Sequence, residues 1–535
     1  MSRTPVTTSR AGSRRPATAG PARRRLRWPA AIPTVIVLAT LAGLAVRLYQ
    51  LSRPGYLLGV TEYDDGTDFG SAIRLIHGAL PYRDFIMVQP PGITLLMAPV
   101  AAATSSFGTV TAMAAARIFT ALASAAAIPL GGLLTRHRGV LAVLVTCGTL
   151  AVYPDGLLAA RTVLLEPWLV LFCLLGALAV FDGDQQATGR RLIWGGAAFG
   201  FAGAVKVWAI LPVLVILVLT ARRPRQAGRF AAGVVAGFCL PVLPFALLAP
   251  VTFYRGVVVA QVVRSDVQRI PLASRLQDML GLTHLPAGST APLVVTGVAV
   301  IVVVAALMAA GSWLSHRRPP PLDWFAAVTC LLVVAAFLWP ADFYEHYAAF
   351  LAPFLALSLA LPIARIVAAL PRQGKRARLG RAGRRAAIAV AAVTVATLAV
   401  LQGTAESHLA SAVPASELSA AAHAIPAGAC VLTDQVSYPI AINRFVSIDP
   451  GCSLMVDGVG SDYALSQGHN GLTGAGRTPA VEQMWLSAFR AARYVWLTGM
   501  ASRRIPWTPP LTAYFHAHFQ PLIRGPVWLY VRRPG

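Results

Sequence analysis

The sequence predicts an α-helical polytopic membrane protein with a small α/β domain at its C-terminal end. Three observations support this fold class. The 535 residues are 56% hydrophobic and only 13% charged, with a mean hydropathy of +0.63, a balance that suits a bilayer better than water. Apolar segments recur along the chain between short arginine-rich runs. Residues 403–535 change character and hold Asp, Asn, Gly and Pro together with short β-rich runs.

The N-terminal segment is basic and polar. Residues 1–28 are rich in Arg, Pro, Ser and Thr and contain no acidic residue, which predicts a disordered cytoplasmic arm that touches anionic lipid. The apolar run behind it is long enough to span a bilayer and lacks a small-residue cleavage site. We therefore expect residues 29–48 to form the first span rather than a cleaved signal.

The membrane domain is predicted over residues 29–402. Basic runs between apolar segments belong in the cytoplasm, which accounts for much of the net charge of +25 without any nucleic acid partner. This rule predicts about eleven crossings of the plasma membrane, with the N-terminus cytoplasmic and the C-terminal domain extracytoplasmic. Residues 91–107 would break this parity, so we expect a re-entrant or interfacial helix there. The other apolar segments lie at 111–134, 139–153, 162–181, 192–205, 207–221, 230–250, 291–313, 323–339, 347–370 and 386–402.

The C-terminal domain is predicted over residues 403–535. The runs CVLTD, RYVWLTG and VWLYVRR are rich in residues typical of strands. Cys430 and Cys452 lie in this polar segment, and an extracytoplasmic location would allow them to form a disulfide. The sequence leaves open whether they pair.

The densest acidic cluster of the chain lies in the first external loop, predicted over residues 50–110. The stretch TEYDDGTDFG, residues 61–70, carries Asp64, Asp65 and Asp68 at the start of a helical pattern. Aspartates cap helix N-termini and complement the helix dipole, which explains one of the three well. A carboxylate at the membrane surface can also take a proton from an attacking hydroxyl group. The sequence therefore supports both a capping and a catalytic interpretation.

This loop resembles the first external loop of the GT-C membrane glycosyltransferases. The matching text is Tyr63-Asp64-Asp65-Gly66, then AIRLIHGALPYRDF, then Gln89-Pro90-Pro91-Gly92. The superfamily includes protein O-mannosyltransferases, lipid A aminoarabinose transferases, and actinobacterial mannosyl- and arabinosyltransferases that use polyprenyl-phosphate donors. The resemblance covers the loop well. Elsewhere this chain and the superfamily share only a coarse topology of many spans and an external C-terminal domain, so the resemblance does not identify one subfamily.

The resemblance implies a GT-C-like catalytic domain in which Asp64 occupies the catalytic acidic position, with Asp65 beside it. In the aminoarabinose transferases a lysine precedes the two prolines, where this chain has Gln89. This departure argues against that subgroup and leaves the donor phosphate to another cation.

Three segments supply candidates for binding the donor phosphate. Lys206 lies between two apolar halves, where a charge is costly unless it has a purpose, although a lysine that reaches the interface is the alternative. The resemblance implies an aromatic-basic pair that contacts the lipid phosphate, and His346 and Tyr347 fit it, although both residue types also favour interfaces. Arg264 lies in a basic loop on the predicted external side.

Glu166 is the candidate for a second acidic site, as an acceptor-binding residue or a metal ligand. Arg161 precedes it by five residues, so the two could instead form a structural pair. Whether the site holds a divalent metal is left open, and no redox cofactor is required.

The interpretation that we adopt is a membrane glycosyltransferase that moves a mannose- or arabinose-like sugar from a polyprenyl-phosphate donor to an extracytoplasmic acceptor. The acceptor is a lipid, a glycan or a protein, and Asp64 is the general base. The alternative is a transporter or flippase for a lipid-linked sugar or another anionic substrate, with Lys206 on its pathway. The absence of matching sequence halves weakens that alternative. A non-catalytic membrane scaffold is a third class, but it would not need an acidic pair and cations on one face.

Overall fold

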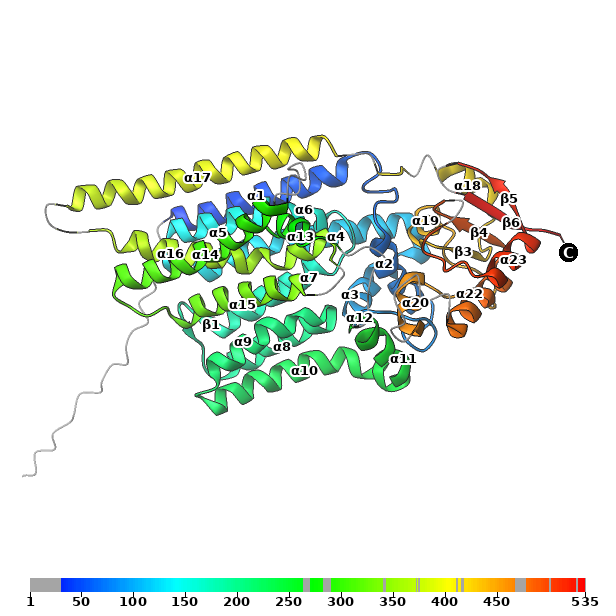
Figure 1. Cartoon of the computed structure of the whole chain (residues 1–535), viewed down its shortest axis with the longest axis horizontal. Helices are drawn as coiled ribbons and strands as arrows, with labels where there is room; N and C mark the ends of the chain where they lie inside the picture. Colours follow the sequence, from blue (N-terminus) through cyan, green and yellow to red (C-terminus); the bar gives the residue numbers. More distant parts are fainter. Residues whose placement is uncertain are drawn as a thin grey trace, which may run out of the picture.

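The computed structural model places the helical part of the chain along the long axis of the molecule and the C-terminal domain at one end (Figure 1). It describes residues 30–262, 270–281, 290–339, 343–371, 373, 376–409, 412–414, 418–466, 478–499, 502–525 and 528–534. The predicted arm, residues 1–28, and the candidate Arg264 lie outside the described residues.

The helices follow the apolar runs closely. The first part of the chain forms α1 (Ala31–Ser52), α2 (Tyr63–Ile76), α3 (Gly92–Ala101), α4 (Thr104–Thr135), η1 (Arg136–Arg138), α5 (Val140–Val152), α6 (Pro154–Ala160), α7 (Glu166–Val180), α8 (Arg190–Val205), η2 (Val207–Ala209), α9 (Ile210–Thr220) and α10 (Pro224–Leu248). After these come α11 (Pro250–Tyr254), η3 (Arg255–Val259), α12 (Ala260–Val262), α13 (Leu272–Met279), α14 (Thr290–Ser315), α15 (Pro321–Leu338), η4 (Glu345–Phe350), α16 (Ala352–Ala368) and α17 (Ala377–Ser407).

Among the described residues, six helices are long and apolar enough to cross a membrane, or seven if the bent pair α5 and α6 is one span. Four shorter apolar helices accompany them, at Gly92–Ala101, Glu166–Val180, Val207–Thr220 and Val302–Ser315. Helix α3 has 10 residues, so its length of about 15 Å is too short to cross a bilayer alone.

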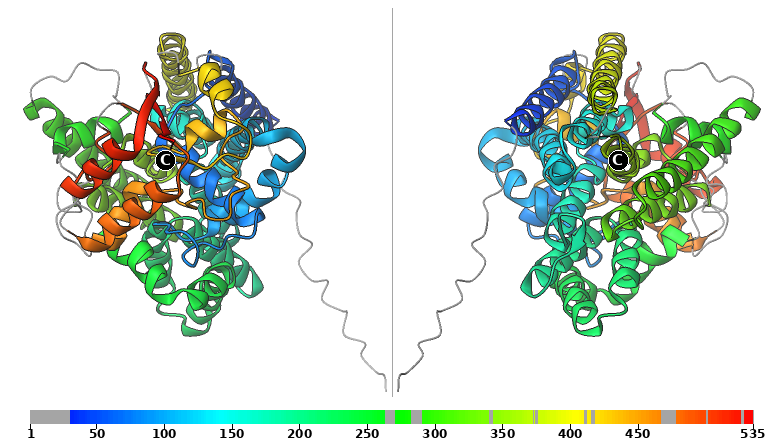
Figure 2. Two further views of the ribbon diagram at one scale, coloured as in Figure 1. Left: turned by 90° about the vertical axis from the view of Figure 1, so that its right-hand side faces the viewer. Right: turned by 90° about the vertical axis from the view of Figure 1, so that its left-hand side faces the viewer.

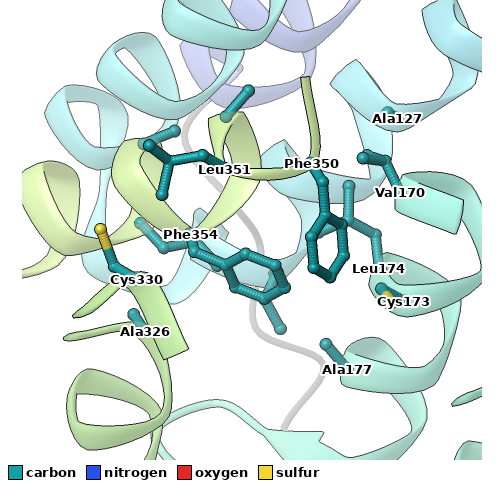
Figure 3. Packing of buried hydrophobic residues seen from close by; sticks show 14 of the residues in the cluster. Ala127, Val170, Cys173, Leu174, Ala177, Ala326, Cys330, Phe350, Leu351 and Phe354 are labelled. Atoms are coloured by element: carbon teal, nitrogen blue, oxygen red, sulfur yellow. The ribbon is translucent and has the colours of Figure 1, made fainter. Parts of the chain in front are cut away.

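The bundle core is a continuous apolar cluster. Phe350, Leu351 and Phe354 from η4 and α16 pack against α7 and α15, whose facing residues include Cys173, Leu174 and Cys330 (Figure 3). Four cysteines lie in apolar runs of the sequence, which predicts small core residues; Cys147, Cys173 and Cys330 are buried free thiols, whereas Cys239 is only partly buried.

The arginine-rich run over the turn between α9 and α10 and the start of α10, residues 222–229, lies at the end of the bundle away from the C-terminal domain (Figure 1). There Arg138 contacts Asp184 at 2.6 Å and Asp323 at 2.8 Å, and Arg365 contacts Asp323 at 3.1 Å. The predicted cytoplasmic runs of the described residues thus share one end, while the acidic helix α2 lies at the other end (Figure 1).

The C-terminal domain has the mixed α/β character that the sequence predicts. Its four-stranded sheet has the order β3-β4-β6-β5, in which β3 and β4 are parallel and the other pairs antiparallel. The three β-rich runs form β3 (Val431–Thr433), β4 (Tyr494–Leu497) and β6 (Trp528–Arg532), whereas β5 (Phe519–Ile523) was not predicted. The domain also contains α18 (Ser419–Ala424), α19 (Ser437–Ala441), α20 (Gly458–Ser466), α22 (Pro479–Ala491) and α23 (Pro509–His518). A two-stranded sheet of β1 (Phe181–Asp182) and β2 (Gln185–Gln186) lies in the bundle. Cys430 and Cys452 form a disulfide, which answers the question that the sequence left open.

Helix α2 lies between the bundle and the C-terminal domain (Figure 1), and the left-hand view of Figure 2 shows that domain, in orange and red, in front of the bundle helices. Arg74, in the last turn of this helix, does not face solvent. Arg74 is only 7% exposed and its guanidinium lies 4.3 Å from the centre of the Phe445 ring. The C-terminal domain therefore covers the face that would otherwise meet water.

Candidate active site

The site lies where the starts of α2, α7 and η4 meet one helix break, at the end of the bundle nearest the C-terminal domain. Lys206 occupies the break between α8 and η2, where its extended backbone interrupts the helix. The side chain is 4% exposed. Its ammonium nitrogen lies 2.5 Å from Glu166 Oε1, and it also sits 3.8 Å from the Trp208 ring centre and 4.2 Å from that of Tyr347. This buried cation is held by one carboxylate and two aromatic faces.

Glu166 begins α7 and is fully buried. Its Oε1 binds Lys206, while its Oε2 has no hydrogen-bond partner among the described residues. The sequence offered Arg161 as a structural partner, but the ion pair that the structure shows is with Lys206, forty residues further along the chain. Arg161 instead stacks on Tyr56, with its guanidinium 5.2 Å from the ring centre.

His346 lies between two carboxylates. Its Nε2 is 3.9 Å from Asp64 Oδ2 and 4.0 Å from Glu166 Oε1. The imidazole stacks on Tyr344 and meets the edge of Tyr347, which in turn packs against Trp208. The aromatic residues of η4 and η2 therefore fix the imidazole and the Lys206 ammonium in one group.

Asp64 and Asp65 are neighbours in sequence but differ in environment. The Asp64 side chain is 42% exposed and open to incoming molecules. Asp65 is fully buried, forms an ion pair with Arg117, and accepts a 2.9 Å hydrogen bond from the backbone N–H of Val163. Arg117 also donates to the carbonyl oxygens of Tyr56 and Leu57. Asp65 thus ties α2 to α4 and to the loop before α7.

Asp68 is a further carboxyl group that the sequence reasoning noted in the cluster but did not select for the site. It lies one helical turn after Asp64, is 2% exposed, and its Oδ2 has no hydrogen-bond partner among the described residues. Burial raises the pKa of Asp68 well above its ordinary value, and the nearby charges of Asp64 and Glu166 raise it further. The spacing of four residues was the available signal, since it places both side chains on one helical face.

Gly66, which follows the acidic pair, and Gly92, which follows the two prolines, each allow another segment of backbone to approach closely. A Cβ on Gly66 would lie 2.4 Å from the Ser437 backbone nitrogen, and one on Gly92 would lie 2.4 Å from the Ala204 carbonyl oxygen. Gly66 therefore permits α19 to pack on α2, and Gly92 permits α3 to pack on the end of α8 beside Lys206. Gln89, at the position of the missing lysine, accepts a 2.5 Å hydrogen bond from the Tyr82 hydroxyl through its backbone oxygen.

The arrangement brings together most of the residues that the sequence singled out. Asp64, Glu166, Lys206, His346 and Tyr347 form one connected group, whereas Asp65 and Arg161 make their contacts beside it. Among the residues that the structure describes, no group of three or more His, Cys, Asp or Glu side chains is arranged to hold a metal ion.

Comparison with known proteins finds a family model and solved structures that are similar to this chain. Residues 88–340 match the model of glycosyltransferase family 87, and no curated protein matches the chain. The structure of ArnT from Cupriavidus metallidurans, solved bound to undecaprenyl phosphate, is 14% identical with a TM-score of 0.58, covering 92% of this chain and 97% of that chain. The Archaeoglobus fulgidus oligosaccharyltransferase, solved with a tethered acceptor peptide, is 15% identical with a TM-score of 0.52, covering 87% of this chain and 68% of that chain.

The family match covers residues 88–340, and the fold of the whole chain is similar to the folds of ArnT and of the oligosaccharyltransferase. Both findings agree with the resemblance of the first external loop to the GT-C membrane glycosyltransferases.

Proposed function

We propose that this protein is a membrane glycosyltransferase, which transfers a sugar from a polyprenyl-phosphate donor to a hydroxyl group of an acceptor on the extracytoplasmic face of the membrane. The observation that carries the proposal is the placement of a half-exposed carboxylate, Asp64, beside a buried cationic group built from Lys206 and His346. The fold similarity to ArnT, which was solved with undecaprenyl phosphate, supports the choice of donor.

Lys206, His346 and Tyr347 are the proposed binding group for the donor phosphate, and Arg264 remains a further candidate. A departing phosphate gains negative charge in the transition state, and a fixed cation in a dry site stabilises that charge strongly. The Lys206 ammonium has three N–H donors, of which Glu166 Oε1 takes one. Glu166 holds the ammonium in place and balances its charge before the donor arrives.

Asp64 is the proposed general base, and Asp65 supports it by fixing α2. The acceptor oxygen attacks the anomeric carbon, its proton passes to the Asp64 carboxylate, and the bond between that carbon and the phosphate oxygen breaks. The electron pair of the broken bond leaves with the polyprenyl phosphate, and the attack from the opposite side inverts the anomeric centre.

Asp68 has the proposed role of orienting the sugar. Burial and the neighbouring carboxylates raise the pKa of Asp68 and so favour its protonated form, and a protonated carboxyl can donate a hydrogen bond. A mannose- or arabinose-like sugar presents hydroxyl groups that can accept this bond. Glu166 then contributes to the second acidic side of the site, where the acceptor would bind.

The test is sugar transfer in membranes supplied with labelled polyprenyl-phosphate mannose or arabinose. At matched protein level, we expect Asp64→Asn to lower the rate by about 10²–10⁴-fold, the usual contribution of a general base. Asp182→Asn is the control, because that side chain is 78% exposed and lies in β1, away from the site. Equal transfer by the Asp64→Asn variant and the wild type would reject Asp64 as the base.

A further inference from the structure

A long apolar groove runs along the outside of the bundle between α5, α16 and α17. Its volume is about 930 Å³, and its walls include Leu141, Val145, Leu359, Ala391, Val395 and Leu398. On α17 the lining extends from Ala387 to His408, which corresponds to about 30 Å of helix and equals the thickness of a bilayer hydrocarbon core. A groove of this length suits a lipid chain that lies parallel to the spanning helices.

The end of the groove nearest the candidate active site is polar but carries little positive charge. Tyr153, Gln402, Thr404 and His408 line that end. Among the described residues that line the groove, none is Lys or Arg, and only His408 can become cationic. A phosphate group would have no strong partner here.

Carboxyl groups continue from this end toward the active site. Asp278 precedes the lining residues Leu280 and Gly281, and the hydroxyl of Tyr153 donates a 2.7 Å hydrogen bond to the carbonyl oxygen of Met279. Glu345 is next to His346 in η4. Burial, followed by the charge of Glu345, raises the pKa of Asp278 to about 7, so the two carboxyl groups lie near each other. Tyr153 also lines a small cavity of about 20 Å³ that reaches Glu166.

We propose that this groove binds the hydrocarbon chain of the acceptor, and that the acceptor is a lipid with an uncharged, hydroxyl-bearing head group. The chain lies along α17, and the head group passes Asp278 and Glu345 toward Asp64. Carboxylates accept hydrogen bonds from sugar hydroxyl groups but repel a phosphate, so the same surface turns away the anionic donor. This inference rests on the proposed function, because it names the class of acceptor.

The experiment uses the purified full-length protein in lipid nanodiscs with two photoreactive probes. One is a glucosyl diacylglycerol with a diazirine in its acyl chain, and the other is undecaprenyl phosphate with a diazirine in its prenyl chain. Ala391→Trp fills the groove, and Ala392→Trp is the matched control because the neighbouring residue is absent from the lining. We expect the glucosyl lipid to label α5, α16 and α17, and Ala391→Trp alone to reduce that labelling by about tenfold, the effect of displacing two methylene groups.

The two claims fail separately in this design. Two results would overturn the groove proposal. In one, the glucosyl lipid labels the groove and Ala391→Trp does not reduce that labelling. In the other, undecaprenyl phosphate labels the same residues. If undecaprenyl phosphate labelled the Lys206→Met variant as well as it labels the wild type, the proposed donor site would be contradicted. The result for the groove would not be affected.

Discussion

At the scale of single residues, the two adjacent aspartates of the loop have different tasks. Asp65 is buried against Arg117, so Asp65→Asn leaves a buried guanidinium without its counter-ion, and such a loss costs about 3–5 kcal/mol of stability. Asp64 is half exposed and its replacement removes no buried pair. We expect Asp65→Asn to lower the thermal unfolding midpoint in detergent and Asp64→Asn to leave it unchanged. A midpoint lowered equally in both variants would contradict this division.

Glu62 gives the site a dependence of stability on pH. Burial, followed by the charge of Asp64, raises its pKa from 4.5 to about 7, although Arg161 opposes part of this shift. Between these two pH values the folded state binds more protons than the unfolded state, so the stability contributed by this group is present at low pH and is lost as the pH rises toward 7.

The measurement is the unfolding midpoint of wild type and Glu62→Gln from acid to neutral pH. Subtracting the two curves removes other groups that titrate in the range, such as Asp278. We expect the wild type to lose stability relative to the variant across this window. A constant difference would show that the pKa of Glu62 is not raised.

The sequence predicted some of these residues for physical reasons and missed others. Asp64, Lys206 and His346 stand out because charges are rare in an apolar chain, and the positive-inside rule places their loops on one side. The pairs Lys206–Glu166 and Asp65–Arg117 could not be predicted, because each joins separate helices whose packing decides the contact. Arg117 gave little sign of its role, since it lies inside an apolar helix.

At the scale of elements, the contact between α2 and α19 depends on one glycine. A Cβ on Gly66 would overlap the backbone of Ser437, and that serine also donates a 2.7 Å hydrogen bond from its hydroxyl to the Glu62 carbonyl oxygen. We expect Gly66→Ala to shift α19 away and to cost about 1–3 kcal/mol, as overpacking commonly does. Thermal unfolding and sugar transfer should both decline.

Gly228→Ala provides the control for that substitution. Gly228 lies in α10 with no heavy atom within 4 Å of an added Cβ, and alanine favours a helix. Its unfolding midpoint should match or exceed that of the wild type. If Gly66→Ala behaved like Gly228→Ala, the close approach of α2 and α19 would not matter for the fold.

The helices themselves were the most predictable elements. Long apolar runs such as residues 111–134 and 386–402 appear within α4 and α17, because twenty apolar residues have few alternatives to a membrane helix. Short elements such as α6, α13 and β5 were not predicted, since their sequences carry too few residues to show a period.

At the scale of the whole molecule, the C-terminal domain holds α2 against the bundle. The Tyr63 hydroxyl donates a 2.8 Å hydrogen bond to Asp457, and the guanidinium of Arg504 lies 4.9 Å from the Tyr63 ring centre. The disulfide of Cys430 and Cys452 closes a segment with a sequence separation of 22 residues within this domain.

Removing that disulfide should loosen the domain. In the chain-entropy model, closure of a segment of this length contributes about 3 kcal/mol. We expect the double variant Cys430→Ser, Cys452→Ser to be cleaved faster by trypsin in the C-terminal domain, with Cys239→Ser as the control because Cys239 is a free thiol in α10. Equal cleavage rates in the two variants would show that the disulfide does not stabilise the domain.

The central claim is that Lys206 holds the donor phosphate while Asp64 acts only in the chemical step. The most direct test is the dissociation constant of undecaprenyl phosphate for the wild type, Asp64→Asn and Lys206→Met in nanodiscs. The account predicts that Lys206→Met weakens binding by about 100-fold, as the loss of a charge-assisted contact in a buried site would, and that Asp64→Asn binds as the wild type does. Wild-type affinity in Lys206→Met, or equal loss in both variants, would contradict it.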